Sequence, residues 1–341
     1  MNNDRSLRPF SRISRYPLDL SSNRFHFAIL QNLAKYEAFA RAFGPIVPGA
    51  TVLDLGTGSG ILSLIAASLG ASHVVAVDRP STIELAKAVL DSHPSFRRRI
   101  TLVSADVFDL PQASSPFDVV VSETIGYLGY EENIAAILAR GSELAGQDAS
   151  IIPQELVVHL HPVRIPRTPK SDVPFLSRAG AVLASGTTLQ APTTFAFGAI
   201  PRDPLLTHHR WQSTTMQRLD GLVATFSVHL GADAWLSNAE SSIWPRCVIP
   251  FTSSHWVGSG AILDLSLLLS PKGDTFYANV EVKAAASELE RLEILTSDIS
   301  AEHVDTEEAT DQDVIRAVSR VLSVVSAQGA HRERHRAQCH A

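Results

Sequence analysis

Residues 51–60 read Thr-Val-Leu-Asp-Leu-Gly-Thr-Gly-Ser-Gly, and the first half of the chain is organised around this stretch. The mostly apolar run 52–55 stops at three closely spaced glycines, and a second apolar run, 61–67, follows directly. This order predicts a buried strand, a tight turn and the start of a helix. Glycines in such a turn can take positive φ and let a ligand approach the backbone, and the helix points its free N–H groups at that ligand.

A second strand ends in a carboxylate at a spacing typical of nucleotide-binding turns. The run 73–78 is largely apolar and ends in Asp78, 22 residues after Gly56. An acid at this distance can accept hydrogen bonds from both ribose hydroxyls of an adenosine ligand. A glycine turn alone is weak evidence, because an ordinary strand-to-helix connection is the simpler alternative. With Asp78, two cofactors stay open: a nicotinamide dinucleotide and S-adenosylmethionine.

Strand-like and helix-like patterns alternate along this half. Strands are expected at 52–55, 73–78, 100–103 and 119–121, and helices at 83–90 and 133–144. Alternation of this kind predicts an α/β fold with a parallel sheet, in which ligands bind beyond the C-terminal ends of the strands. Four carboxylates fall at or just past such ends: Asp54, Asp78, Asp106 and Glu123.

Beyond Pro153 the pattern changes to short, partly alternating strands, which predicts a mainly β second domain. These strands are expected at 156–160, 223–229, 261–269, 275–282 and 292–295. The segment 165–210 is rich in Pro, Ser, Thr and Ala and is interpreted as a loop or an arm, with a short helix at 177–184. Helices are also expected at 25–43 and 314–326, with a frayed tail after Gly329.

Composition narrows the class of protein. The 341 residues carry a net charge of −6 without an interior block of lysine and arginine, which disfavours a nucleic-acid partner. Two cysteines and no Cys/His metal spacing predict neither a disulfide framework nor a metal site, as expected in a reducing cytoplasm. The polar N-terminus does not read as a signal peptide, and no apolar run is long enough to cross a membrane.

The sequence after the fourth strand reads Ser122-Glu123-Thr124-Ile125-Gly126, followed shortly by Glu131-Glu132. Here the chain resembles the protein arginine methyltransferases and their bacterial relatives, a branch of the class I S-adenosylmethionine-dependent methyltransferases. The likeness covers about 25–300, with its motifs in the family's order. It implies a Rossmann-like methyltransferase domain at 46–152, preceded by a helical segment at 1–45 that covers the cofactor.

The same resemblance implies how the rest of the chain is divided. A β-barrel-like substrate domain is expected at 153–330, with a dimerisation arm around 165–210 and a flexible tail at 331–341. A homodimer is therefore expected. The chain departs from the family at Ser242 and Ile243, where a Thr-His-Trp loop would carry threonine and histidine.

The paired acids have a physical rationale of their own. A guanidinium is planar and presents a fork of donors, which two carboxylates can share in charge-assisted hydrogen bonds. Such a grip would align one nitrogen with a methyl donor. Glu123 is the first candidate; family spacing favours Glu132 as the second, whereas the Tyr-Glu order favours Glu131. The alternative is that Glu123 caps its loop and the other two form the first turn of a helix.

The resemblance also assigns binding residues. Tyr127 and Trp244 are expected to contact the substrate, although Trp244 would serve equally well as a barrel-core residue. The residues expected around S-adenosylmethionine are Lys35, at its carboxylate, and Asp54, Gly56, Thr57, Gly58, Gly60, Ile61, Leu62, Asp78, Arg79, Asp106, Val107 and Glu123. An exposed helix lysine at position 35 and a strand-end cap at Asp106 are equally plausible alternatives.

These observations favour an S-adenosylmethionine-dependent methyltransferase acting on a guanidino nitrogen of arginine, free or in a peptide or protein, with small-molecule biosynthesis as one setting. The alternatives are an O- or N-methyltransferase of another natural product and a non-catalytic cofactor-binding partner subunit. A nicotinamide-dependent dehydrogenase is a further alternative, but it leaves the loop around Glu123 unexplained.

Overall fold

A computed structural model of the chain describes residues 21–112, 115–166, 175–177, 181–197, 205–239, 245–272, 275–284, 287–295, 300–301 and 308–339. Its first half is built on a five-stranded parallel sheet in the order β3-β2-β1-β4-β5. The strands are β1 (Thr51–Leu55), β2 (His73–Asp78), β3 (Ile100–Ser104), β4 (Val119–Val121) and β5 (Ser150–Ile152). The predicted α/β fold is confirmed.

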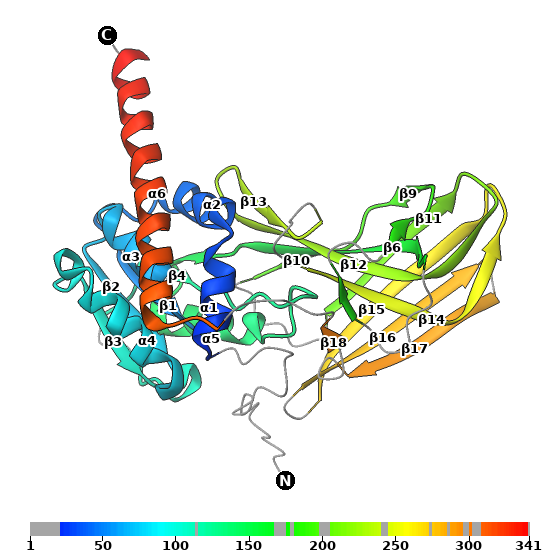
Figure 1. Ribbon diagram of the computed structural model, residues 1–341, viewed down its shortest axis with the longest axis horizontal. Coiled ribbons are helices and arrows are strands. Elements are labelled where there is room, and N and C mark those ends of the chain that lie inside the picture. Colours follow the sequence, from blue (N-terminus) through cyan, green and yellow to red (C-terminus); the bar gives the residue numbers. More distant parts are fainter. Residues whose placement is uncertain are drawn as a thin grey trace.

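Helices connect these strands and cover the sheet, as Figure 1 shows. They are α3 (Ile61–Ser68), α4 (Pro80–Asp91) and α5 (Ile134–Ala145), with short 3-10 turns η1 (Pro94–Phe96) and η2 (Val107–Asp109). Almost every residue of α3 is buried, because this helix lies under other helices as well as on the sheet. Pro80 begins α4, where its missing N–H has no helical partner to lose.

The N-terminal segment forms two helices where the sequence predicted one. α1 (Asn23–Leu30) and α2 (Leu33–Phe43) are separated by two residues. Asn32 makes the break, because its side-chain oxygen accepts a hydrogen bond from the backbone N–H of Lys35 and so caps a new helix. Because one apolar periodicity runs through both helices, the sequence pattern did not show that a second helix begins after Asn32.

The second half consists of two mainly antiparallel sheets that curl around an apolar core (Figure 1). The strands of the first sheet are β6 (Glu155–Arg164), β7 (Phe175–Ser177), β8 (Val182–Leu183), β10 (Thr194–Ala196), β12 (Gln217–Gly231), β13 (Ala234–Ser237), β14 (Arg246–Val257) and β18 (Ser300–Ala301). The strands of the second sheet are β9 (Gly186–Gln190), β11 (Leu205–Ser213), β15 (Ile262–Lys272), β16 (Thr275–Ala284) and β17 (Ser287–Leu295). This arrangement confirms the predicted barrel-like half.

The segment 165–210 differs from its prediction in the part that the structure describes. The expected helix at 177–184 is absent there, since residue 177 ends β7 and β8 is an extended strand. β8 and β10 pair with β6, and β9 pairs with β11, so these pieces belong to the two sheets. Alternating side chains in short strands can imitate helical spacing over so few residues.

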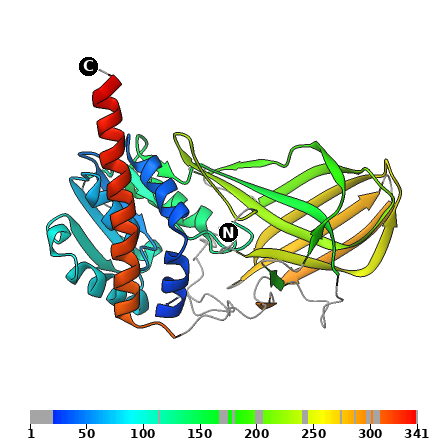
Figure 2. The ribbon, with the colours of Figure 1, turned by 45° about the horizontal axis from the view of Figure 1, so that its top comes forward.

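A long C-terminal helix, α6 (Asp311–Cys339), lies across the helical layer of the first half. It contacts α1, α2, α3 and α4, and Figures 1 and 2 show its far end extending beyond the rest of the fold. Val314, Val318 and Val321 are buried along its contact face. The helix continues through positions where the sequence predicted a frayed tail. It packs on the first half of the chain, whereas the sequence analysis placed residues 153–330 in the second domain.

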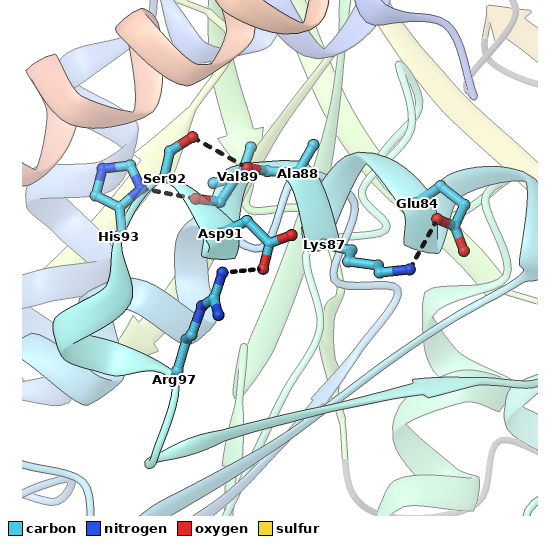
Figure 3. Close-up of polar contacts among 8 residues, drawn as sticks. All are labelled: Glu84, Lys87, Ala88, Val89, Asp91, Ser92, His93 and Arg97. Carbon is cyan, nitrogen blue, oxygen red and sulfur yellow. Dashed lines mark hydrogen bonds and ion pairs between the residues drawn. The ribbon is translucent and has the colours of Figure 1, made fainter.

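Two polar contacts fix α6 at points far apart in the sequence. The side-chain amide of Asn23 in α1 donates to the carboxylate of Asp311 at 2.7 Å. Just past the end of α4, drawn in Figure 3, one ring nitrogen of His93 lies 2.8 Å from the Val89 carbonyl oxygen. Its other ring nitrogen lies 3.1 Å from the Ser319 hydroxyl. Within the described residues, no helix has the length and apolar character needed to cross a membrane.

Candidate active site

The glycine turn after β1 has the conformation that its sequence predicts. Gly56, Gly58 and Gly60 have φ of 74°, 57° and 79°, in the left-handed region that favours glycine. The backbone N–H groups of Gly56 and Thr57 donate to the Val77 carbonyl and so join the turn to β2. The turn therefore presents its backbone at the C-terminal edge of the sheet, next to the first turn of α3.

Asp54 is buried beneath this turn. One of its oxygens, Oδ2, accepts hydrogen bonds from the hydroxyls of Thr57 and Ser63, at 2.7 and 2.6 Å. The other oxygen, Oδ1, is buried and has no hydrogen-bond partner within the described part of the chain. Burial raises the pKa of Asp54 to about 6, against the two hydroxyls, which lower it. The free oxygen is thus an acceptor that a bound ligand with a donor group would satisfy.

Asp78 holds the other side of the turn. Its Oδ2 accepts the backbone N–H of Gly58 at 2.8 Å, and its Oδ1 accepts that of Arg79 at 2.7 Å. Burial raises the pKa of Asp78, and these hydrogen bonds oppose that effect. Each carboxylate oxygen can accept more than one hydrogen bond, so both could also accept the predicted ribose hydroxyls.

Glu123 follows β4, and its two neighbours in the chain contact the end of β1 and the glycine turn. The Ser122 hydroxyl donates to the Leu55 carbonyl at 2.7 Å, and the methyl group of Thr124 lies over Gly56. Glu123 forms an ion pair with Lys35 of α2, with 3.0 Å between Oε1 and Nζ. The side chains are 16% and 4% exposed, so the predicted exposed-lysine alternative for Lys35 is wrong.

Burial and pairing act in opposite directions on these two charges. Burial is the largest effect on Lys35 and lowers its pKa, but the charges and hydrogen bonds of Glu123 and Tyr36 together outweigh burial and raise that pKa. Burial raises the pKa of Glu123, and Lys35 opposes it. The 3.0 Å contact pairs the two groups, because either charge alone would be costly at this depth.

Glu131 turns back into its own loop. Both of its oxygens accept from the backbone N–H of Leu128, at 2.9 and 3.0 Å, and Oε2 also accepts from Tyr130 at 3.2 Å. Glu131 is 8% exposed, whereas Glu132 is half-buried just before α5. The structure therefore fixes the carboxylate of Glu131 more tightly than a solvated helix turn would.

Two further residues approach the site without having been predicted. The ring of His26, buried in α1, lies against Gly58. The ring of Tyr36 lies beside Lys35, with Nζ 5.1 Å from its centroid, and burial raises the pKa of its hydroxyl to about 12. Both residues occupy apolar helix faces, where a sequence pattern gives no sign of what they contact.

The remaining predicted residues take different positions. Asp106 accepts the N–H of Phe108 at 3.0 Å and caps η2, in line with the predicted alternative that it is a cap. Tyr127 is half-buried in the loop of Glu131, while Trp244, Ser242 and Ile243 lie outside the described residues. The side chains of Ile61, Leu62 and Val107 are buried in the core, so any contact that they make with a cofactor would come from their backbones. The side chain of Arg79, in contrast, is half-exposed.

Comparison with known proteins agrees with this geometry. A family described as "Methyltransferase domain" matches residues 52–143, which include the glycine turn, Asp78 and the loop of Glu123. Protein arginine N-methyltransferase 1 of Saccharomyces cerevisiae is 36% identical over 110 residues, 32% of this chain and 31% of the relative. A probable histone-arginine methyltransferase of Oryza sativa subsp. indica is 31% identical over 142 residues, 40% of this chain and 24% of the relative.

The chain contains a methyltransferase domain that is similar in sequence to protein arginine N-methyltransferases. Its fold is similar to that of solved protein arginine methyltransferases from Trypanosoma brucei (TM-score 0.69, 16% identity) and Arabidopsis thaliana (TM-score 0.68, 17% identity). These structures cover 81% of this chain, and the match takes in 99% and 98% of theirs. By sequence, the chain matches about a quarter to a third of the length of these curated relatives.

Proposed function

We propose that the chain transfers the methyl group of S-adenosylmethionine to a guanidino nitrogen of arginine, free or within a peptide or protein. The observation that carries this proposal is the loop after β4, which places Glu123 beside the glycine turn and holds the buried carboxylate of Glu131 within the same loop. The names of the family relatives, which are arginine methyltransferases, agree with it.

The described residues fit S-adenosylmethionine chemically. The unpartnered oxygen of Asp54 suits an ammonium or hydroxyl donor, and the carboxylate of Asp78 suits a ribose hydroxyl. The turn between them has no Cβ atoms at Gly56, Gly58 and Gly60, so a ligand can reach the backbone. When bound, the cofactor would supply an electrophilic methyl group.

The chain's own residues would bind and orient the acceptor. Glu123 and Glu131 would each accept part of the guanidinium fork, which fixes the orientation of the attacking nitrogen. We infer that Glu131, and not Glu132, is the second acid. Backbone N–H groups of Leu128 and Tyr130 already hold its carboxylate, so little conformational entropy is lost on binding.

The identity of the methyl acceptor is tested by incubating the purified protein with methyl-labelled S-adenosylmethionine. Free arginine, an arginine peptide and an arginine-rich protein are each offered as acceptor. Mass spectrometry is expected to locate the label on a guanidino nitrogen. Glu123→Gln and Glu131→Gln should each lower the rate at least ~100-fold, and Glu132→Gln only a few-fold. Label on none of the three acceptors would overturn the proposal, and a large loss only with Glu132→Gln would reassign the second acid.

The ion pair between Lys35 and Glu123 favours a second candidate, methyl transfer to an oxygen or nitrogen of an uncharged natural product. An acid already neutralised by an ammonium attracts a guanidinium less than a free carboxylate does. In that case Glu123→Gln would leave transfer to the uncharged acceptor largely intact while removing any transfer to arginine.

We also propose that the protein is a cytoplasmic homodimer. Two cysteines in 341 residues suit a reducing compartment, and the solved family member from Trypanosoma brucei is described as a heterotetrameric complex. Sedimentation equilibrium measures the mass in solution, and fractionation of the source cells gives the compartment. A mass near 37 kDa at micromolar concentration would exclude the dimer.

A further inference from the structure

Helix α1 lies over the glycine turn and packs on the C-terminal helix α6. The ring of His26 in α1 rests against Gly58, and this histidine is buried. A cofactor that reaches the backbone of the turn therefore lies next to α1. What holds α1 in place thus bears on how the cofactor enters and leaves.

α1 needs support from another element. It is eight residues long, which is fewer than an isolated helix needs to be stable in water. The break at Gln31 and Asn32 separates it from α2, which begins at a cap of its own. Within the described part of the chain, α6 is the element that α1 contacts most extensively, and Figures 1 and 2 show the two helices side by side.

Asp311 joins the two helices at the point where both begin. Its Oδ1 accepts a hydrogen bond from the side-chain amide of Asn23 at 2.7 Å, and these two residues are the first of α6 and of α1. An acid suits this place, because each helix presents the positive end of its dipole there. Next to Asp311, the N–H of Thr310 donates to the carboxylate of Asp313 at 2.9 Å, and the N–H of Asp313 donates to the Thr310 hydroxyl at 3.3 Å. This reciprocal cap fixes the start of α6.

α6 is in turn fixed to the half of the fold that carries the glycine turn. It contacts α2, α3 and α4, and Val314, Val318 and Val321 are buried along this face. The hydroxyl of Ser319 lies 3.1 Å from a ring nitrogen of His93, just past the end of α4. Because α3 begins directly after the glycine turn, α6 ties α1 to the same body that carries the turn.

We propose that α6 is a clasp that holds α1 closed over the cofactor, and that Asp311 is a positioning residue that acts through Asn23. The cofactor enters and leaves while α1 is open, so the strength of the clasp sets both rates of exchange. A weaker clasp raises the open fraction of the free and of the bound protein by the same factor, and the affinity stays constant. This inference goes beyond the proposed function and rests on it only through the cofactor.

The clasp is tested by stopped-flow measurement of the association and dissociation of S-adenosylhomocysteine with the full chain. Asp311→Ala and Asn23→Ala remove the same hydrogen bond, so each should raise both rate constants about three-fold to ten-fold and leave Kd within about two-fold. The double variant should match the single variants, because all of them break one contact. Unchanged rates would overturn the clasp. Faster dissociation without faster association would also overturn it, since that result means an altered turn.

Arg97→Ala is the matched control. Arg97 forms a 2.7 Å ion pair with Asp91, and both residues lie outside α1 and α6 (Figure 3). Both rate constants should keep their wild-type values in this variant, and the same acceleration as in Asp311→Ala would overturn the clasp.

Hydrogen exchange gives a second readout that needs no ligand. In Asp311→Ala, the amides of α1 should exchange about three-fold to ten-fold faster, while those of α3 keep the wild-type rate. An equal acceleration in both helices would show that the variant loosens the whole fold, and this would overturn the clasp.

Failure of the clasp and failure of the proposed function give different results. Labelled arginine product together with wild-type exchange rates in Asp311→Ala would remove the clasp and leave the function. No binding of S-adenosylhomocysteine to the wild type, together with no labelled arginine, would overturn both.

Discussion

The carboxylate of Glu131 lies over the Cα atom of Gly126, in the space that a Cβ atom at position 126 would occupy. The loop after β4 therefore closes on itself, with the acid packed against a glycine and hydrogen-bonded to Leu128 and Tyr130. Any side chain at position 126 must move the acid, which makes this contact a sensitive probe of the site.

Gly126→Ala is expected to lower kcat/KM for arginine about 100-fold, because a shift of about 1 Å in a positioning group can cost that much. Affinity for S-adenosylhomocysteine should change less than two-fold, since the glycine turn is untouched. Steady-state kinetics and calorimetry measure the two effects. Gly258→Ala is the matched control, because a Cβ there meets nothing within 4 Å. Normal kinetics in Gly126→Ala would show that Glu131 has no part in catalysis.

The raised pKa of Asp54 predicts a pH-dependent stability. Because its pKa is about 6 when folded and about 4 when unfolded, the folded chain holds a proton between these values that the unfolded chain has lost. The contribution of Asp54 to the free energy of unfolding is therefore greatest below pH ~4 and falls as the pH rises through ~6. Urea unfolding from pH 4 to 7 should show Asp54→Asn gaining stability relative to the wild type. A constant difference would mean that the pKa is not raised.

The raised pKa of Asp54 also predicts that the affinity for the cofactor rises with pH, whereas the stability falls. If the ionised Asp54 receives the cofactor's ammonium, affinity for S-adenosylhomocysteine should rise about ten-fold from pH 5 to pH 7, as the ionised fraction at a pKa of about 6 does. Calorimetry of Asp54→Asn should give a flat profile over this range. A rise of the same size in the variant would assign the titration to another group.

His26 is expected to hold the cofactor from above the glycine turn. Its ring packs on Gly58 and is buried, so His26→Ala should weaken S-adenosylhomocysteine binding about ten-fold, the equivalent of burying one medium-sized side chain. His73→Ala serves as the control. His73 begins β2, and its ring contacts the hydroxyl of Thr101 in β3. Unchanged binding in His26→Ala would confine this histidine to packing.

The C-terminal helix is expected to stabilise the fold of the first half. Val318 is fully buried where α6 crosses the other helices, so Val318→Ala should lower the free energy of unfolding by about 1.5 kcal/mol for two lost methyl groups. Arg320→Ala, at an exposed position of the same helix, should change it little. Equal urea midpoints for the wild type and Val318→Ala would show that α6 does not contribute to the cooperative unit.

The sequence alone determined the parallel sheet, the glycine turn, Asp78 and the loop of Glu123. Each of these depends on local features: a buried strand reads as a short apolar run, a left-handed turn requires glycine, and successive strand ends meet at one edge of the sheet. It did not separate α1 from α2, because the cap at Asn32 lies inside one continuous apolar pattern.

Only the tertiary structure decided which residues meet across long separations. Apolar periodicity shows which face of a helix is buried and does not show what covers it, so the docking of α6 on α1 could not be foreseen; Asn23 and Asp311 are 288 positions apart. The pairing of Lys35 with Glu123 is of the same kind, since neither residue's neighbours encode it. The sequence placed an acid beside a cofactor turn, and the fold decided which cation holds that acid.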